Sequence, residues 1–170
     1  GVGCNGTSGT IKSALVAEES GADGLLVVTP YYNRCTQRGL VLHYREVCAS
    51  TRLPVIAYNV PSRTGVNMLP ETAADIAAIP NLVGIKEASG NAVQFQETVR
   101  LCGKNAVVYS GEDSLDYAGL CLGSGGIISV AAGVYPEAFV ALHKAYREGR
   151  SVDARNFQFA LTRLINALFC

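Results

Sequence analysis

The sequence has no block of like charge. Only 16% of its 170 residues are charged, and 14 Lys and Arg balance 14 Asp and Glu. Proteins that bind nucleic acid or an anionic membrane surface normally carry clustered basic residues. The composition therefore argues against nucleic acid and membrane as partners, and it favours small molecules or further copies of the same chain.

Long apolar runs are also missing. No stretch approaches the roughly 18 to 20 apolar residues of a membrane-spanning helix, and the first residues lack the pattern of a signal peptide. We therefore expect a protein that is neither membrane-bound nor exported, and we place it in the cytoplasm.

Paired metal ligands are the third absence. The six cysteines have no CxxC spacing and mostly fall in apolar patterns, where cysteine acts as a small hydrophobic residue. The two histidines, His43 and His143, lie far apart in the sequence. The sequence thus predicts reduced thiols, no metal site and no cofactor.

Apolar residues are abundant, at 49% of the chain, which suffices for one globular core. The chain starts at Gly1 without an initiator methionine, and it stops at Cys170 inside an apolar helical pattern. We expect a fragment of a longer protein, in which residues 1–4 end an earlier strand.

Five short apolar runs recur, each bounded by Gly, Pro or Asn. Their length and uniform apolarity are typical of parallel strands that are covered on both faces. The runs are residues 24–29, 54–60, 82–86, 106–110 and 126–130. Between them, apolar residues repeat with helical spacing and predict helices that pack on the sheet, at Leu40, Tyr44, Val47 and Cys48 and at Phe95, Thr98, Val99 and Cys102.

Boundary residues agree with alternating strands and helices. Pro70 and Pro136 suit first helical residues, and Gly149 suits a helix end. Four residues suit N-caps: Thr10, Asn91, Ser114 and Ser151. A final amphipathic helix follows the last strand-helix unit, with Phe157, Leu161, Leu164 and Leu168 on one stripe.

Repeated βα units form either an open doubly wound sheet or a closed (β/α)8 barrel. Unusual residues fall at or just past the ends of successive apolar runs: Thr29, Tyr58, Lys86, Gly111 and Ile128. The carboxyl-end rim is where barrel enzymes build their sites. We therefore predict an incomplete (β/α)8 barrel over residues 1–150, about strands 3 to 8, and the start of a C-terminal helical extension over residues 151–170.

Lys86 closes the apolar run of GIKEASG (residues 84–90). An apolar strand end lowers the pKa of an amine through desolvation, and a neutral lysine can form a Schiff base. Two structural interpretations compete: the ammonium pairs with Glu87, or it guards a sheet edge.

Tyr58 and Arg63 lie in YNVPSRTG (residues 58–65), at and just past the end of the preceding run. A phenol near an amine can move protons during imine formation, although a lone Tyr more often caps a core. The planar fork of Arg63 suits a substrate carboxylate, or it is a solvated loop residue.

Tyr31 and Tyr32 lie in TPYYN (residues 29–33), followed by Arg34. Adjacent tyrosines after a strand suggest a site wall or a subunit contact, with core packing open for one of them. The glycine-rich segment at residues 3–13 lacks the Gly-Lys order of a phosphate-binding loop, and residues 123–126 precede their strand, which indicates a tight turn.

Taken together, TPYYN, YNVPSRTG, GIKEASG, SGED (residues 110–113) and GGIISV (residues 125–130) closely resemble the dihydrodipicolinate synthases, or 4-hydroxy-tetrahydrodipicolinate synthases, of the N-acetylneuraminate lyase superfamily. The resemblance runs over the whole chain. It implies a barrel with added C-terminal helices, assembled as a homotetramer of two dimers. It also implies condensation of pyruvate with L-aspartate 4-semialdehyde in diaminopimelate and lysine biosynthesis.

The resemblance assigns roles to six residues. Lys86 matches the lysine that forms the pyruvate imine, Tyr58 the tyrosine that donates and accepts protons, and Tyr32 a relay tyrosine that reaches a neighbouring subunit's site. Arg63 matches the arginine that holds the carboxylate of the semialdehyde, and Gly111 and Ile128 match positions that line the pyruvate pocket.

Two departures limit the resemblance. The family's Thr-Thr pair is not in this sequence, so the chain by itself should be a defective catalyst. Asn5 and Tyr31 match a lysine-inhibition site, but Gly9 stands where an acidic residue would be, which makes feedback inhibition doubtful. A sialic-acid lyase, a keto-deoxy-sugar-acid aldolase and a non-catalytic barrel remain as alternatives. Arg63 favours the synthase, because a cation there suits a short aldehyde that carries a carboxylate.

Overall fold

The structure is a computed structural model that describes residues 1–169. Its centre is one parallel sheet of five strands whose spatial order follows the chain. The strands are β1 (Leu25–Val28), β2 (Val55–Asn59), β3 (Leu82–Glu87), β4 (Val107–Ser110) and β5 (Gly126–Ile127). The five predicted runs are therefore confirmed as parallel strands.

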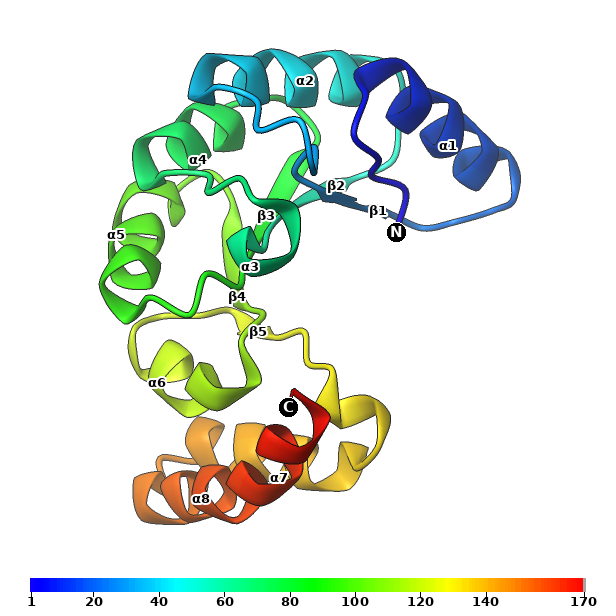
Figure 1. Cartoon of the computed structure of the whole chain (residues 1–170). Coiled ribbons are helices and arrows are strands. Elements are labelled where there is room, and N and C mark those ends of the chain that lie inside the picture. Colours follow the sequence, from blue (N-terminus) through cyan, green and yellow to red (C-terminus); the bar gives the residue numbers. More distant parts are fainter. Residues whose placement is uncertain (170) are drawn as a thin grey trace.

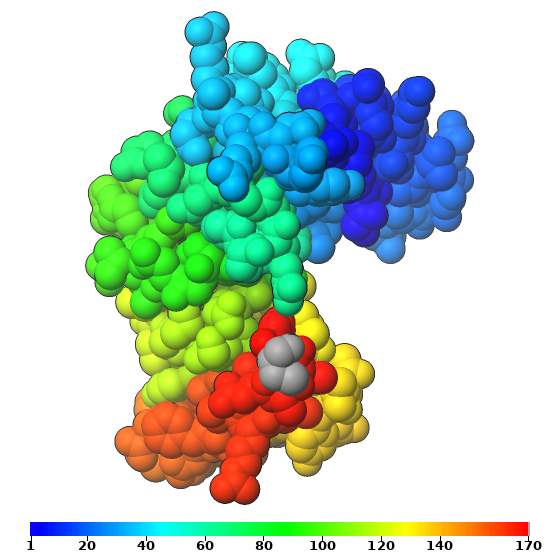
Figure 2. Space-filling view, in the orientation of Figure 1, coloured from blue at the N-terminus to red at the C-terminus, as the bar shows by residue number. Residues whose placement is uncertain are grey.

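Helices follow each strand and cover one face of the curved sheet. They are α1 (Thr7–Glu19), α2 (Gln37–Ala49), α3 (Pro61–Thr64), α4 (Pro70–Ala77), α5 (Ala92–Cys102), α6 (Asp116–Cys121), α7 (Pro136–Arg147) and α8 (Ser151–Leu168), with the short 3-10 helices η1 (Asp113–Leu115) and η2 (Ala131–Gly133). Figure 1 shows α1, α2, α4, α5 and α6 along the outside of an arc, with the strands inside it. The inner side of the arc is open, and Figure 2 shows the hollow it leaves between the two ends of the molecule.

The main core lies between the sheet and the outer helices. Alternate strand residues point outward into it and are fully buried, as Val27, Ala57 and Ile85 are. The predicted helical face of α2 is buried against them, and the Tyr44 hydroxyl donates to the Val27 carbonyl at 2.8 Å. The opposite strand residues face the open inner side and are only half-buried. The alternation decides which side chains face the interior of the arc.

A second core lies under the last three helices. It contains Leu120, Ala131, Phe139, Leu142, Leu161 and Ile165. Gln158 of α8 ties this cluster to η1 and α6, because its Nε2 donates to the Asp113 carbonyl at 2.9 Å and its Oε1 accepts from the Tyr117 N–H at 3.0 Å. Helix α8 thereby supports the turn that follows β4. No helix within residues 1–169 is both long and apolar enough to cross a membrane.

Several predicted boundaries are confirmed. Pro70 and Pro136 begin their helices, and Asn91 caps α5 by accepting from two backbone N–H groups. Gly149 has a φ of 74°, in the left-handed region that glycine adopts without strain at a helix end.

Three predicted N-caps are wrong. Thr10 lies inside α1, where its hydroxyl donates to the Gly6 carbonyl at 3.1 Å. Ser114 lies inside η1, and Ser151 is the first residue of α8 rather than its cap. A serine or threonine hydroxyl can cap a helix, or it can bond the preceding turn from inside the helix. The residue type alone therefore does not distinguish an N-cap from a helical position.

Two strand predictions need correction. Within the described residues, 1–4 form no strand, although the Val2 N–H donates to the Leu26 carbonyl at 3.0 Å. Strand β5 ends at Ile127, because the chain turns there into η2 after one further bond from the Ile128 N–H to the Ser110 carbonyl, at 2.8 Å.

Candidate active site

Lys86 lies on the inner face of the sheet, near the carboxyl end of the central strand β3. Strand register places it beside Tyr58 of β2 and Tyr109 of β4. The residue is only 6% exposed, and its Nζ lies 4.3 Å from the centroid of the Tyr58 ring. The structure therefore brings together the amine and the phenol that the sequence singled out.

The surroundings of Lys86 weaken its basicity. Burial lowers the pKa of the amine, against the negative charges of Asp113 and Asp116. Its ammonium makes no ion pair or hydrogen bond with any side chain in the described part of the molecule. A buried amine without an ion pair or hydrogen bond is disposed to lose its proton and act as a nucleophile.

Both structural interpretations of Lys86 are wrong. Glu87 points to the opposite face of the sheet, where it accepts from the Asn59 Nδ2 at 2.8 Å and from the Ser89 N–H at 2.7 Å. Successive strand residues point to opposite faces, so neighbours in sequence do not pair here. Lys86 cannot guard an edge either, because β3 has a neighbour on each side.

Gly111 forms the wall against which the Lys86 side chain lies. A Cβ at residue 111 would come within 2.6 Å of the Lys86 Cε and 2.8 Å of its Cγ. The Gly111 N–H donates to the Glu87 carbonyl at 2.9 Å, and the Ile128 N–H donates to the Ser110 carbonyl at 2.8 Å. Both predicted lining positions thus lie just past the ends of β4 and β5, with their N–H groups already engaged.

Tyr58 and Arg63 share a second wall of the hollow. They line one pocket together with Leu26, Val28, Tyr31, Val60 and Thr64 and two glycines near the N-terminus. Burial raises the pKa of the Tyr58 phenol, and the positive charge of Arg63 acts in the opposite direction. The short helix α3 begins at Pro61, directly after β2, and it turns the chain so that Arg63 lines the same pocket as Tyr58.

Tyr32 is separate from this group. It is 84% exposed, and its backbone has a φ of 73°, held by a bond from its N–H to the Thr64 carbonyl at 3.1 Å. A non-glycine residue in this region costs roughly 1 to 3 kcal/mol and often marks a functional segment. Tyr31 is 40% exposed, so core packing of either tyrosine is wrong.

A buried polar cluster on the outer face supports the site from behind. Asn59 connects it: its Nδ2 donates to the Asn67 Oδ1 and to Glu87, and its Oδ1 accepts from the Met68 N–H at 2.9 Å. Gln94 of α5 donates to the Asn67 Oδ1 at 2.9 Å. The sequence analysis missed this cluster, for which the polar Asn59 and Glu87 at the ends of apolar runs were the available signal.

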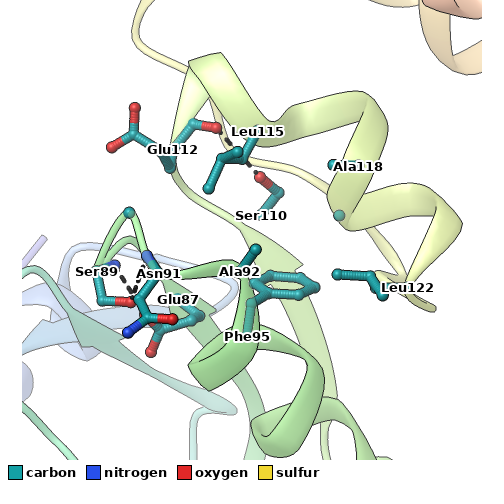
Figure 3. A pocket seen from close by; sticks show the side chains of 12 residues that line it. Glu87, Ser89, Asn91, Ala92, Phe95, Ser110, Glu112, Leu115, Ala118 and Leu122 are labelled. Atoms are coloured by element: carbon teal, nitrogen blue, oxygen red, sulfur yellow. Dashed lines mark hydrogen bonds between the residues drawn. The ribbon is translucent and has the colours of Figure 1, made fainter.

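A small pocket lies on this outer side, between α5 and α6. Figure 3 shows Phe95, Ala118 and Leu122 across from Ser89 and Glu112, with Ser110 between them. The pocket has room for only about 10 Å³ of accessible volume, on the order of one water molecule. It lies on the opposite face of the sheet from Lys86 and belongs to the helix layer.

Metal ligands do not gather in this structure. Over residues 1–169 no group of three or more His, Cys, Asp or Glu side chains could hold a metal ion. The five described cysteines are all free thiols.

An arc of parallel strands with outer helices, and a buried lysine at the carboxyl end of its central strand, has the architecture of part of a (β/α)8 barrel. The chain belongs to the dihydrodipicolinate synthetase family, whose model matches residues 1–170. The sequence prediction of an incomplete barrel from this family is confirmed.

Individual relatives agree along the whole chain. It is 45% identical to the 4-hydroxy-tetrahydrodipicolinate synthase of Alkaliphilus oremlandii over 170 residues, which are 100% of this chain and 59% of the relative. It is 46% identical to the enzyme of the same name from Syntrophus aciditrophicus over 169 residues, which are 99% of this chain and 58% of the relative.

Solved structures give the same result. Dihydrodipicolinate synthase from Thermotoga maritima superposes with a TM-score of 0.96 at 45% identity, over 99% of this chain and 58% of that one. The pyruvate complex of the chloride-inhibited enzyme from Acinetobacter baumannii gives 0.95 at 38% identity, over 100% and 58%. The chain spans about three-fifths of the length of these relatives.

Proposed function

We propose that the full-length protein that carries this chain condenses pyruvate with L-aspartate 4-semialdehyde to 4-hydroxy-tetrahydrodipicolinate, in the biosynthesis of diaminopimelate and lysine. The observation that carries the proposal is the unpaired, buried Lys86 amine 4.3 Å from the Tyr58 ring, in a member of this family. Relatives that bear the name of this synthase support the choice of reaction.

The chemistry starts at Lys86. Its neutral amine adds to the keto carbon of pyruvate, and loss of one water from the carbinolamine gives the imine. Tyr58 is the register neighbour of Lys86 on the next strand. Its phenol supplies a proton to the departing hydroxyl of the carbinolamine and takes a proton back in the later steps. Loss of a methyl proton from the imine gives an enamine, which attacks the aldehyde carbon of the second substrate. Cyclisation through the substrate's amino group then releases the lysine.

The remaining site residues bind. Arg63 holds the carboxylate of the semialdehyde by two parallel hydrogen bonds. The N–H groups of Gly111 and Ile128 already serve the sheet, so their carbonyls are the main-chain groups that would face pyruvate. Exposed Tyr32 is assigned to the site of a neighbouring subunit, which requires a homo-oligomer, a tetramer of two dimers.

The chain by itself is assigned no activity, because it has no Thr-Thr pair to hold the pyruvate carboxylate. We assign residues 1–150 to the barrel and residues 151–170 to the start of the C-terminal helical extension. The reaction needs no metal or other cofactor in this scheme, and we place the enzyme in the cytoplasm.

Reductive trapping tests the proposal. The full-length protein is incubated with pyruvate, reduced with borohydride and digested, and the modified peptide is identified by mass spectrometry. We expect the adduct on Lys86, its loss in Lys86→Ala and its retention in Lys12→Ala, which removes an exposed lysine instead. An unmodified Lys86 would refute the Schiff-base mechanism.

The second substrate is tested separately. With the adduct established, L-aspartate 4-semialdehyde should consume the enamine. Arg63→Ala should raise the KM for the semialdehyde much more than the KM for pyruvate. Turnover of a keto-deoxy-sugar acid or of sialic acid, with none of the semialdehyde, would instead assign one of the two aldolase alternatives.

A further inference from the structure

Asp116 is a buried carboxyl group that the proposed reaction does not use. It is the first residue of α6 and is 0% exposed. Its Oδ1 accepts from the Ser110 hydroxyl at 2.7 Å, whereas its Oδ2 is buried and has no hydrogen-bond partner among residues 1–169. An ionised carboxylate with one uncompensated oxygen is expensive to bury, so this environment favours the uncharged acid.

Neighbouring groups set where Asp116 changes its charge. Burial raises its pKa to about 8, against the hydrogen bond from Ser110. The carboxylates of Asp113 and Glu112 raise the pKa as well, and the charge of Lys86 lowers it. The group therefore exchanges its proton at mildly alkaline pH.

Arg155 of α8 is a charged group that faces α6 from a packed helix, and its charge acts on Tyr117; the other contacts are with uncharged groups. Helix α5 places the Phe95 ring beside Gly119, and α8 places the Gln158 amide at the Tyr117 N–H. Helix α7 contributes the Tyr146 hydroxyl, which donates to the Leu120 carbonyl at 2.7 Å. The charges that act on Asp116 itself are those of Lys86 on β3 and of Glu112 and Asp113 in the turn between β4 and α6.

Asp113 is a useful contrast to Asp116. Both of its carboxylate oxygens accept backbone hydrogen bonds, from the Val130 N–H at 3.2 Å and from the Ala131 N–H at 2.7 Å. These bonds compensate a negative charge and hold the loop after β5. Asp116 has no such compensation for its second oxygen, although it lies only three residues further along the chain.

The geometry connects Asp116 to Lys86 through one strand end. Ser110, which bonds Asp116 on the outer face, is followed directly by Gly111, which touches the Lys86 side chain on the inner face. The ionised carboxyl groups of both Asp113 and Asp116 favour the charged form of the Lys86 amine. Of these two acids, Asp116 is the one whose second oxygen is buried without a partner and whose pKa burial raises to about 8.

We propose that Asp116 is a positioning residue that controls the charge of the Lys86 amine: while uncharged it leaves the amine free to lose its proton, and once ionised it holds that proton on the amine. The consequence for catalysis rests on the proposed function, since imine formation with pyruvate would then slow as Asp116 ionises.

Competitive labelling tests the proposal without pyruvate. The full-length protein and its variants are treated with trace acetic anhydride from pH 7 to 10, and acetylation of Lys86 is read by mass spectrometry. Above pH 8, Lys86 of Asp116→Asn should react about three- to tenfold faster than wild type, because the charge that retains the proton is gone. At pH 7 the two should react alike.

Two further variants separate this effect from a loss of structure. Ser110→Ala removes the hydrogen bond that helps Asp116 to ionise. The pH above which Lys86 reacts more slowly than in Asp116→Asn should therefore be higher in Ser110→Ala than in wild type. Glu97→Gln removes an exposed carboxylate that bonds Arg100 on α5, and it should leave Lys86 unchanged. If Asp116→Asn does not fold, the Ser110→Ala profile decides.

Labelling profiles of Asp116→Asn or Ser110→Ala that superimpose on wild type would overturn the proposal. An altered profile together with no pyruvate adduct on Lys86 would support the control of charge by Asp116 and refute the Schiff-base function instead. An altered profile together with faster imine formation in Asp116→Asn above pH 8 would support both.

Discussion

At the scale of single residues, the site depends on an amine that the fold deprives of partners. Lys86 faces the inner side of the sheet with a phenol beside it and a glycine against its methylene chain. The nearby acid that could pair with it, Glu87, is turned to the other face by the pleat of the strand. The reactivity that we propose for Lys86 follows from the groups that are kept away from the amine as much as from those beside it.

Gly111 offers a direct test of how closely Lys86 is confined. In Gly111→Ala the new Cβ would overlap the Lys86 Cε and Cγ and lie 3.1 Å from the Ala88 Cβ. The flexible lysine can swing aside, so we expect the free energy of unfolding to fall by only about 1 kcal/mol. The amine would be misplaced, however, and trapping with pyruvate should slow about tenfold or more.

The matched control is Gly133→Ala, where a Cβ meets no atom within 4 Å. It should trap pyruvate at the wild-type rate. Equal trapping by Gly111→Ala and wild type, measured at the same pH, would show that Lys86 is not held against this wall.

At the scale of elements, helix and strand positions followed from the sequence, whereas several precise ends did not. Apolar runs such as 82–86 predicted strands because their sequence lacks the polar alternation of a strand with one solvated face. Proline at residues 70 and 136 fixed two helix starts because its ring removes one backbone donor and presets φ. Serine and threonine were ambiguous, because the same hydroxyl can cap a helix or bond its preceding turn.

The candidate site was predictable to a similar extent. Lys86, Tyr58 and Arg63 were recognisable because parallel strands bring their carboxyl ends to one rim. Asp116 was not, since its importance comes from burial behind Ser110 and from an oxygen left without a partner. Both depend on how α6 packs, and no local pattern records that.

The contact between α1 and α2 predicts a pH-dependent stability. His43 of α2 is buried with its Nδ1 2.9 Å from the Thr7 Oγ1, and its Nε2 has no partner among the described residues. Burial lowers the pKa of His43 below its ordinary 6.5. As the pH falls, the unfolded chain therefore protonates His43 before the folded chain does. The contribution of His43 to the free energy of unfolding is fully present above about pH 6.5 and is lost below it.

We expect the urea midpoint of the full-length protein to decrease when the pH is lowered from 7.5 to 5. In His43→Leu this decrease should be smaller, because no imidazole remains at residue 43 to be protonated. His143→Leu, which removes the half-exposed histidine of α7, is the control and should retain it. An acid-induced decrease of the same size in wild type and His43→Leu would assign the loss to other groups.

At the scale of the whole molecule, the 170-residue chain has two sheet ends with unlike protection. Within residues 1–169, β1 pairs with β2 alone, apart from one bond from Val2, and β5 pairs with β4 alone. Half-buried apolar side chains of β1 and β2 also face the hollow seen in Figure 2. Unpaired strand edges beside apolar surface promote pairing between chains.

The isolated 170-residue chain should therefore associate at micromolar concentration, which sedimentation velocity can measure. Leu26→Lys places a charge on β1 facing the hollow, and it should weaken association because pairing would bury that charge. Val93→Lys adds the same charge on the outer surface of α5, where residue 93 is 78% exposed, and should leave association unchanged. A chain that sediments as a monomer and unfolds in one cooperative step would contradict the expectation, because the edges would then be protected by the fold itself.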